Sequence, residues 1–327
     1  MAAQRSAGHR QPGTEPGRRV RRTLGLLPPV CGYGEVVDGE EWVECRCGMR
    51  HWGAYGAAGL LLLDSVPARQ VVLQHRASWT HFGDSWGIPG GARHAGEDAT
   101  AGALREAEEE AGIAAEHVQV LASRVLQHPD WSYTTVLARV AGPVRPRVTD
   151  KESAQIEWVG IDQVTDLPLL PAFADAWPEL TPMAATTAVL VVDAANVVGS
   201  RPDGWWRDRA GATERLLHQL EDLARRGVPA ELLGLPGDRW WPHVVLVTEG
   251  QARTVTAVEG GRVEVVAAER DGDSRIVAEA AERAHGPGTR AVAVVTADRE
   301  LGRRVEDTGA HRLGPRLLLD LLDTLTD

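Results

Sequence analysis

The side chains of this chain that are best suited to chemistry lie between positions 91 and 113. In that segment the charged residues follow a defined spacing: Glu97, Arg105, Glu106, Glu109 and Glu110. On a helix the last three carboxylates, at positions i, i+3 and i+4, lie side by side and repel one another by about 0.2–0.5 kcal/mol per pair. A hard divalent cation removes that repulsion, because magnesium prefers oxygen ligands. The spacing predicts a magnesium site, and the alternative is a solvated acidic helix face.

The segment that carries these carboxylates has the composition of a helix. Residues 100–111 are rich in Ala, Glu, Leu and Arg, which are strong helix formers. Asp98 or Thr100 can cap the N-terminus of such a helix, and Gly112 follows as a stop. We predict a helix over 100–111 with a narrow apolar stripe made of Ala103, Leu104, Ala107 and Ala111.

The flanking sequence predicts a mixed sheet between helices over residues 55–180. Apolar or alternating runs typical of strands occupy 57–64, 70–74, 118–125, 133–140 and 155–159. A second helix is expected over 173–180. The Gly90-Gly91 pair ahead of the acidic helix permits close approach of the backbone, so that the Gly90 carbonyl is a candidate metal ligand.

The order of these residues resembles the Nudix box, G-x5-E-x7-R-E-U-x-E-E-x-G-U, in which U is apolar. The pattern begins here at Gly91 and ends at Ile113, and its one mild departure is Ala107, which is smaller than the usual aliphatic residue. The resemblance implies a Nudix fold over 55–182 and a hydrolase that uses Mg2+ or Mn2+. In that family, water attacks a phosphorus of a nucleoside diphosphate that is linked to another group.

The resemblance also implies roles for individual residues. The metal would be held by Glu106, Glu109 and Glu110, and Glu106 is also the candidate base. Arg105 would orient the helix carboxylates, and Glu97 would support the site by hydrogen bonding. Family members often add a carboxylate from a later loop; here the candidate is Glu152, and the alternative is an ordinary exposed acid. The box does not identify the substrate, and the aromatic residues that could either stack a base or belong to the core are Trp79, Phe82, Trp131 and Tyr133.

Composition sets bounds on the rest of the chain. A length of 327 residues leaves room for two or three domains, and 43% hydrophobic with 25% charged residues is typical of globular proteins. The net charge of −11 argues against a broad nucleic-acid-coating surface. No apolar run approaches the ~20 residues of a membrane span, so no membrane partner is expected. Residues 1–30 are expected to be flexible, and the apolar run at 24–27 is too short for an export signal, which favours a cytoplasmic location.

The three cysteines of the chain precede the predicted Nudix part and are followed by a histidine. Three thiolates and one imidazole, a set that suits tetrahedral zinc, come from Cys31, Cys45, Cys47 and His51. The pattern predicts a structural zinc knuckle over 31–54 that takes no part in the chemistry. A Cys-x-Cys pair is less typical of zinc than Cys-x2-Cys, and reduced cytosolic thiols without a metal are the alternative.

After a predicted linker at 181–187, the sequence returns to apolar strands that alternate with helices. Strands are expected over 188–192, 244–247 and 291–295, and helices over 212–226, 274–285 and 299–307. This alternation is typical of a parallel three-layer α/β domain, here over 188–327. Because parallel strands end at one edge of their sheet, we expect four acids to converge there: Asp193, Glu249, Asp273 and Asp298.

The same residues resemble the NYN branch of PIN-like domains. The likeness rests on Asp193 and Asn196 after the first strand, on Gly272-Asp273, and on Asp298 within Val-Thr-Ala-Asp-Arg-Glu-Leu, with Glu249 as a further candidate. It implies an acidic site that binds Mg2+ or Mn2+ and cleaves RNA. Ser274 departs from the pattern, since relatives often carry a second Asp there, and the alternative is a domain whose strand-end acids are caps or surface residues. Residues of types that either bind phosphates and stack bases or simply pack are Arg201, Trp205, Trp206, Arg207, Arg209, Arg239, Trp240 and Trp241.

The sequence therefore predicts a Nudix pyrophosphohydrolase fused to a PIN-like domain. Its expected partners are a nucleotide or nucleoside diphosphate derivative and, at the C-terminal domain, RNA. Two alternatives stay open: an RNA nuclease whose Nudix part senses a nucleotide, and a C-terminal half that is a non-catalytic binding module. A homodimer is compatible with the sequence.

Overall fold

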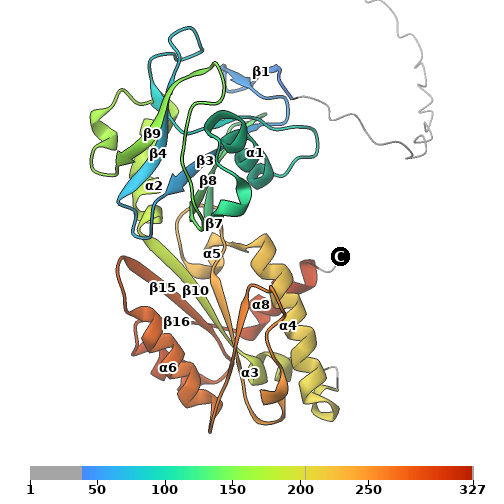
Figure 1. The fold of residues 1–327 in the computed structure, drawn as a ribbon. Coiled ribbons are helices and arrows are strands. Elements are labelled where there is room, and N and C mark those ends of the chain that lie inside the picture. The colour runs from blue at the N-terminus through green and yellow to red at the C-terminus, as the bar shows by residue number, and fades with distance from the viewer. Residues whose placement is uncertain (1–38, 203, 326–327) are drawn as a thin grey trace, which may run out of the picture. The chain divides into compact units, whose positions relative to one another are not determined.

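The computed structural model describes residues 39–202 and 204–325 of the chain (Figure 1). All of these residues belong to one compact unit. Two predictions concern residues outside the described ranges. They are the flexibility of residues 1–30 and the binding of zinc by Cys31. None of the helices within the described ranges is long and apolar enough to cross a membrane.

A nine-stranded mixed sheet occupies the part in which the sequence predicted one. Its order is β11-β12-β7-β8-β3-β4-β5, with β6 paired to β3 and β9 paired to β4. The strands from this part of the chain are β3 Ala57–Leu63, β4 Gln70–Arg76, β5 Trp86–Gly87, β6 Gly90–Ala92, β7 Val118–Gln127, β8 Ser132–Val140 and β9 Ser153–Gly160. Strands β3 and β8 run parallel, whereas β3 pairs with β4 and β6 in the antiparallel sense. The mixed sheet is confirmed.

Helices cover both faces of this sheet, which explains why β3 is apolar at every position. Helix α1 (Ala99–Ala111) shares a hydrophobic cluster with Leu60 and Leu62 of β3. Helix α2 (Pro171–Ala184) shares another cluster with Leu61 and Leu63. Because successive side chains of a strand point to opposite faces, α1 and α2 pack on opposite sides of β3.

A second sheet is entirely parallel and has the order β14-β13-β10-β15-β16. Its strands are β10 Thr186–Asp193, β13 His243–Thr248, β14 Val263–Ala267, β15 Thr289–Val295 and β16 His311–Leu313. The longer helices around it are α3 Ala194–Gly199, α4 Arg209–Arg226, α6 Gly272–Ala284, α7 Arg299–Glu306 and α8 Pro315–Thr324. In β10, Val191 packs in a cluster with α6 and α7, whereas Leu190 packs in the cluster that contains α4 and α8. The predicted parallel three-layer arrangement is confirmed.

Two features of the chain between the sheets differ from the sequence-based expectation. The expected linker at 181–187 does not exist as such, because α2 continues to Ala184 and β10 begins at Thr186. The segment that follows α4 forms β11 (Val228–Pro229), α5 (Ala230–Leu233) and β12 (Arg239–Trp240). Strand β12 pairs with β7, so this segment of the C-terminal part extends the first sheet.

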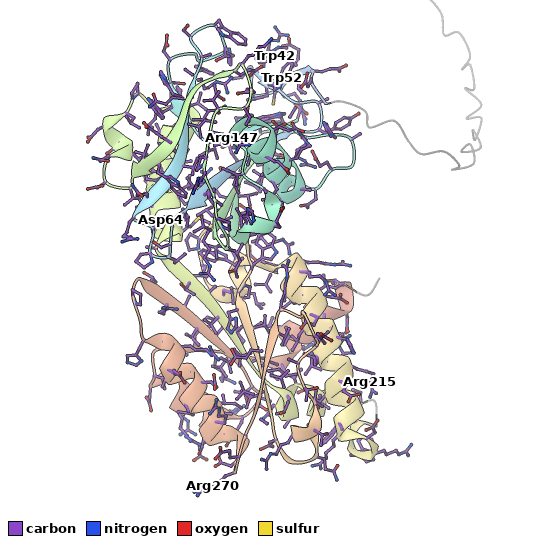
Figure 2. The ribbon with its side chains drawn as sticks, viewed as in Figure 1. Trp42, Trp52, Asp64, Arg147, Arg215 and Arg270 are labelled. Atoms are coloured by element: carbon purple, nitrogen blue, oxygen red, sulfur yellow. The ribbon has the colours of Figure 1, made fainter. Side chains whose placement is uncertain are left out.

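The N-terminal end of the described chain is a small hairpin. Strands β1 (Trp42–Glu44) and β2 (Arg50–Trp52) pair only with each other, in the antiparallel sense. Trp42 and Trp52 pack edge to face with ring centroids 5.4 Å apart (Figure 2). Short 3-10 turns complete the elements: Ala115–His117, Val164–Asp166, Trp205–Arg207 and Gly250–Thr254.

Candidate active site

Helix α1 is fixed at both ends by its own sequence. The Asp98 carboxylate accepts a hydrogen bond from the Thr100 N–H at 2.8 Å, so Asp98 rather than Thr100 is the N-cap. Gly112 ends the helix with φ 64°, and its N–H bonds the carbonyls of the last turn. The face that carries Ala103, Ala107 and Ala111 is fully buried against the sheet. The carboxylates on the other side of α1 are therefore held in place by a rigid element.

Arg105 joins the carboxylates of α1 to the loop that precedes it. Its Nε and Nη2 donate to the two oxygens of Glu97 at 2.9 and 3.0 Å, and Nη2 also reaches the Ala92 carbonyl at 2.8 Å. Its Nη1 donates to Glu106 at 2.8 Å and to Glu109 at 3.1 Å. These hydrogen bonds from Arg105 hold the pKa of the Glu97 carboxyl below its ordinary value. The structure thus brings together Glu97, Arg105, Glu106 and Glu109.

Glu106 approaches the backbone of the Gly90-Gly91 strand. A Cβ atom on Gly91 would lie 2.7 Å from the Glu106 carboxylate, so any other residue at this position would displace that carboxylate. Burial raises the pKa of the Glu106 carboxyl, and the nearby charges of Glu109 and Glu97 raise it further, against the lowering effect of Arg105. The Glu106 carboxylate is therefore partly shielded from water, and it holds a proton more readily than an exposed glutamate does.

Glu110 is the most buried acid of helix α1, with 8% of its surface exposed. Its Oε2 accepts a hydrogen bond from the Gly90 N–H at 2.8 Å. Burial raises the pKa of its carboxyl to about 8, with further contributions from the charges of Glu106 and Asp150, whereas the Gly90 N–H and the Gln74 amide lower it. Gly90 thus reaches this site through its N–H.

The donor set fits a hard cation. Glu106, Glu109 and Glu110 supply oxygen ligands from one helix face, which is the ligand type that magnesium and manganese prefer. Beside them Gln74 is 1% exposed, and its Oε1 has no hydrogen-bond partner among the described residues. A cation bound here would give the buried Gln74 oxygen a partner. It would also balance the charge of the buried Glu110 carboxylate.

The loop between β8 and β9 carries a second acid, Asp150, besides the Glu152 that the sequence favoured. Glu152 is exposed, and its carboxylate lies 3.8 Å from the Arg76 guanidinium. Asp150 acts electrostatically on Glu110 and accepts a hydrogen bond from the Ser153 hydroxyl at 2.6 Å. The Thr149 N–H donates to the Glu110 carbonyl at 3.2 Å, which holds this loop along α1. Both acids belong to one short Asp-Lys-Glu run, and no sequence signal distinguishes which of them faces the helix.

The four aromatic candidates have different environments. Trp79 and Phe82 are 67% and 50% exposed, so both are free to contact a ligand. Trp131 stacks on His51 with ring centroids 4.4 Å apart. The Tyr133 hydroxyl lies over Gly59, and burial raises the pKa of its phenol.

In the parallel sheet, the strand-end acids gather at the carboxyl edge. Asp193 ends β10, is 4% exposed, and accepts hydrogen bonds from the Asn196 side chain at 2.6 Å and from the Thr296 hydroxyl at 2.9 Å. Asp298 caps α7 by accepting from two backbone N–H groups at 2.7 and 3.0 Å. Glu249 follows β13 and accepts from the Gly272 N–H at 2.9 Å, at the start of α6.

Asp273 connects these acids electrostatically. Burial raises the pKa of its carboxyl first, and the charges of Asp298, Glu249 and Asp271 raise it further. Burial likewise raises the pKa of Asp193, with a contribution from Asp273. Ser274 donates its N–H to Asp271, which caps α6. Within the described ranges, no ion pair joins Asp193, Asp273 or Asp298 to a basic side chain.

The arginine and tryptophan residues that the sequence offered as RNA contacts differ in how exposed their side chains are. Trp240 is 1% exposed and its Nε1 donates to the Pro236 carbonyl, so its role is packing; the base-stacking interpretation is wrong for this residue. Trp241 donates its Nε1 to the Arg225 carbonyl at 3.0 Å. Trp206 is 59% exposed, and the Arg209 guanidinium lies 5.3 Å from the centre of the Trp205 ring.

The thiol and imidazole groups expected to bind zinc come together in the β1–β2 hairpin. Ligand atoms of Cys45, Cys47 and His51 all lie within 4.8 Å of one another. Cys45 is buried and Cys47 is exposed. This cluster is built from the hairpin, whereas the carboxylates described above belong to α1.

The chain is similar to known proteins in sequence and in structure. A model of the NUDIX domain matches residues 55–180. A Mycobacterium tuberculosis protein described as "Putative 8-oxo-dGTP diphosphatase 3" is 44% identical over 178 residues, which make up 51% of this chain and 80% of that protein. A Bifidobacterium longum "Nucleoside triphosphate pyrophosphatase/Nudix hydrolase fusion protein" is 46% identical over 160 residues, and the chain spans 33% of its length. Among solved structures, RenU, a Nudix hydrolase from M. smegmatis, is 42% identical, with 45% of this chain and 96% of that chain covered and a TM-score of 0.41.

Proposed function

The chain belongs to the Nudix family, and from this premise we propose that the α1 site hydrolyses the pyrophosphate bond of a nucleotide or nucleoside diphosphate derivative with Mg2+ or Mn2+. The observation that carries the proposal is the buried Glu110 carboxyl, whose pKa is raised to about 8 beside the charges of Glu106 and Asp150. Such a group is costly to ionise unless a cation accompanies it. The unpaired Gln74 oxygen next to it adds to the same requirement.

Each residue of the site would have a defined part in this reaction. Glu106, Glu109 and Glu110 would hold the metal, which neutralises phosphate charge and acidifies the attacking water. Glu106 would take the proton from that water, since its partly buried carboxyl already has a raised pKa. Arg105, anchored on Glu97 and Ala92, would keep Glu106 and Glu109 in position. We retain the Gly90 carbonyl and Glu152 as proposed ligands, and add Asp150 as the loop acid that acts on Glu110.

The descriptions of the relatives narrow the substrates to be tried first. One relative is described as an 8-oxo-dGTP diphosphatase and another as a nucleoside triphosphate pyrophosphatase fused to a Nudix hydrolase. We propose nucleoside triphosphates with altered bases as the leading class, ahead of nucleotide sugars and dinucleotides. The exposed rings of Trp79 and Phe82 are proposed contacts for the base.

The test compares Glu110→Gln with Glu108→Gln in the full chain. Glu110 is buried at the site, whereas Glu108 is exposed on the same helix, so both changes remove one charge from α1. Metal-dependent release of nucleoside monophosphate should fall by about 10²-fold or more in Glu110→Gln, because a positioned charge is lost from the reacting centre. Glu108→Gln should keep wild-type rates. Equal rates in the two variants, on a substrate that the wild type hydrolyses, would remove the assignment.

We propose a second site in residues 188–327, a PIN-like acidic centre that binds a divalent cation and cleaves RNA. Its support is the effect of the Asp273 charge, which helps burial to raise the pKa of Asp193, together with the effects of Asp298 and Glu249 on the pKa of Asp273. Asn196, which donates to Asp193, would orient that carboxylate. The alternatives are that this half only binds RNA, and that the RNA nuclease is the main activity and the Nudix site senses a nucleotide.

Separate variants distinguish these possibilities. Asp273→Asn should abolish Mg2+- or Mn2+-dependent cleavage of single-stranded RNA while leaving nucleotide hydrolysis unchanged, and exposed Asp320→Asn is the control. RNA that is bound but never cut by the wild type would favour the binding module. Cleavage that continues in Asp273→Asn would contradict the acidic centre. A structural zinc, the other metal that the sequence predicts, would belong to a different cluster and take no part in either reaction.

A further inference from the structure

The β1–β2 hairpin carries a group of donors that the proposed hydrolysis does not use. We call Cys45, Cys47 and His51 the hairpin cluster. Its ligand atoms lie within 4.8 Å of one another, and Cys47 Sγ is 3.2 Å from His51 Nε2. Among the residues that the structure describes, no other group of three such donors is this close together. Two thiolates and an imidazole are the donor types that zinc prefers and magnesium avoids.

The backbone of the hairpin brings these donors together. Glu44 pairs with Arg50, so residues 45–49 form the connection between the strands. The Cys45 N–H donates to the Met49 carbonyl at 3.1 Å, and the Gly48 N–H donates to the Cys45 carbonyl at 2.9 Å. Gly48 has φ 86°, a conformation that glycine adopts without strain. The turn therefore presents both thiols on a closed and regular connection.

A second segment of the chain supports the turn from outside. The Arg46 N–H donates to Asp130 Oδ2 at 2.8 Å, and the Arg46 Nε donates to both Asp130 oxygens at 2.8 and 3.0 Å. The backbone N–H groups of Cys47 and Asp130 lie beside the Cys45 thiol. Such N–H donors stabilise a thiolate and orient it toward a metal.

The imidazole of the hairpin cluster is held by the same segment. The His51 ring stacks on Trp131 with an interplanar angle of 8°, and Trp131 Nε1 donates to the Trp52 carbonyl at 3.0 Å. The loop at 128–131 thus contacts two of the three donors without supplying a donor itself. Metal ligands are commonly oriented by an outer set of contacts of this kind.

We propose that Cys45, Cys47 and His51 bind one Zn2+ that stabilises the β1–β2 hairpin against the loop at 128–131. A two-stranded hairpin is marginally stable by itself, whereas the binding free energy of a structural zinc adds directly to the stability of the fold. Three donors leave one tetrahedral position, and the remaining cysteine of the chain, Cys31, lies outside the described residues. The proposal does not depend on the hydrolase assignment.

Metal content of the untagged full chain tests the proposal. Protein expressed with zinc in the medium and purified without chelator should contain about one Zn2+ per chain. Cys47→Ser and His51→Ala should each lose it. His128→Ala is the matched control, because the His128 ring lies 4.3 Å from that of His51 but is not part of the hairpin cluster. Glu110→Gln should also keep its zinc, which separates this site from the carboxylates of α1.

Two further measurements identify the ligands without relying on activity. Cobalt substitution should give thiolate-to-metal charge-transfer absorption in the wild type and in His128→Ala, and none in Cys47→Ser. The exposed Cys47 thiol should react with a disulfide reagent only after a chelator has been added. A metal-free wild type whose thiols react at once, or zinc retained in both Cys47→Ser and His51→Ala, would overturn the proposal.

Discussion

At the scale of single residues, Glu110 shows how burial changes what a carboxylate can do. It is 8% exposed, its pKa is raised to about 8, and Glu106 and Asp150 place further negative charge nearby. A protein that only needed a helix at this position would gain by replacing Glu110 with an apolar residue. The cation that we propose beside Glu110 would give a physical reason for a buried acid at this position.

The raised pKa of Glu110 predicts how the stability of the metal-free protein depends on pH. The folded pKa of about 8 lies above the ordinary value of 4.5, so the folded state binds the proton more tightly than the unfolded state. The resulting stabilisation is complete below about pH 4.5, declines as the pH rises, and is lost once the pH passes about 8. Glu110→Gln stays neutral, so its thermal midpoint in chelator should exceed that of the wild type by more at about pH 9 than at about pH 5.

The control for this pH experiment is Glu108→Gln, which changes the same net charge at an exposed position. Its midpoint should run parallel to that of the wild type across the pH range. If Glu110→Gln also runs parallel, the Glu110 carboxyl does not have a raised pKa in the folded protein.

Gly91 gives a prediction about geometry rather than charge. A Cβ atom there would lie 2.7 Å from the Glu106 carboxylate, so Gly91→Ala should displace that side chain. We expect metal-dependent hydrolysis to fall by about 10-fold or more, since small misplacements of a positioned group have large effects on rate. Gly314→Ala, at a site where an added Cβ meets nothing, is the control for a generic glycine effect. Unchanged rates in Gly91→Ala would show that the Glu106 position is not critical.

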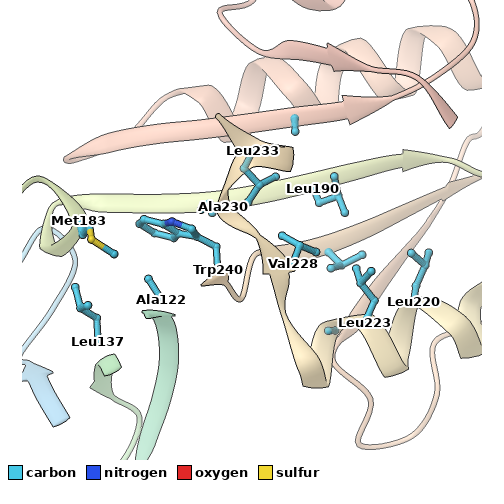
Figure 3. Close-up of a cluster of buried hydrophobic side chains, with 14 of the residues drawn as sticks. Ala122, Leu137, Met183, Leu190, Leu220, Leu223, Val228, Ala230, Leu233 and Trp240 are labelled. Atoms are coloured by element: carbon cyan, nitrogen blue, oxygen red, sulfur yellow. The ribbon is translucent and has the colours of Figure 1, made fainter. Parts of the chain in front are cut away.

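At the scale of elements, strand β12 connects the C-terminal part of the chain to the mixed sheet. It pairs Trp240 with Ala122 and Arg239 with Ser123 of β7, which lie 118 and 116 residues earlier in the chain. Gly237, with φ 86°, turns the chain into this strand where an added Cβ would meet Met183 at 2.6 Å. Trp240 is buried among side chains that include Ala122, Leu137 and Met183 (Figure 3).

Trp240→Ala tests the contribution of this element. Loss of a fully buried tryptophan should lower the free energy of unfolding by about 3–5 kcal/mol, because a cavity replaces its contacts. Trp206→Ala removes an equally large side chain that is 59% exposed, and it should change stability by no more than about 0.5 kcal/mol. Chemical denaturation measures both values. Equal values for the two variants would contradict the packing of β12 described here.

At the scale of the described molecule, one hydrophobic cluster reaches both sheets. It contains Leu61 and Leu137 of the mixed sheet together with Leu190 and Leu220 of the parallel part. Helix α2 runs into β10 with one residue between them, and β12 returns to β7. The mixed sheet and the parallel sheet therefore share part of their hydrophobic core.

A shared core predicts cooperative unfolding of the described residues. Differential scanning calorimetry of the full chain should show a single main transition, since neither sheet can lose its packing without exposing part of the other. Trp240→Ala should shift that transition as a whole. Two well-separated transitions, with only one of them moved by Trp240→Ala, would show that the two parts unfold independently.

The sequence by itself determined the local elements and the types of chemistry. The composition of residues 100–111 predicted the helix that carries Glu106, Glu109 and Glu110, and Gly112 predicted where that helix ends. Continuous apolar runs marked strands covered on both faces, as in β3 and β10. These features follow from residues within a few positions of one another, whose periodicity and capping are local properties of the chain.

Only the tertiary structure decided which distant residues meet. It brought the charge of Asp150 close enough to act on Glu110, and it placed β12 beside β7. It also made Trp240 a core residue and brought the loop at 128–131 to the hairpin cluster. Such contacts form between surfaces that are far apart in the sequence and become buried against each other only on folding. For two acids in one short loop, the local sequence does not show which of them faces the site.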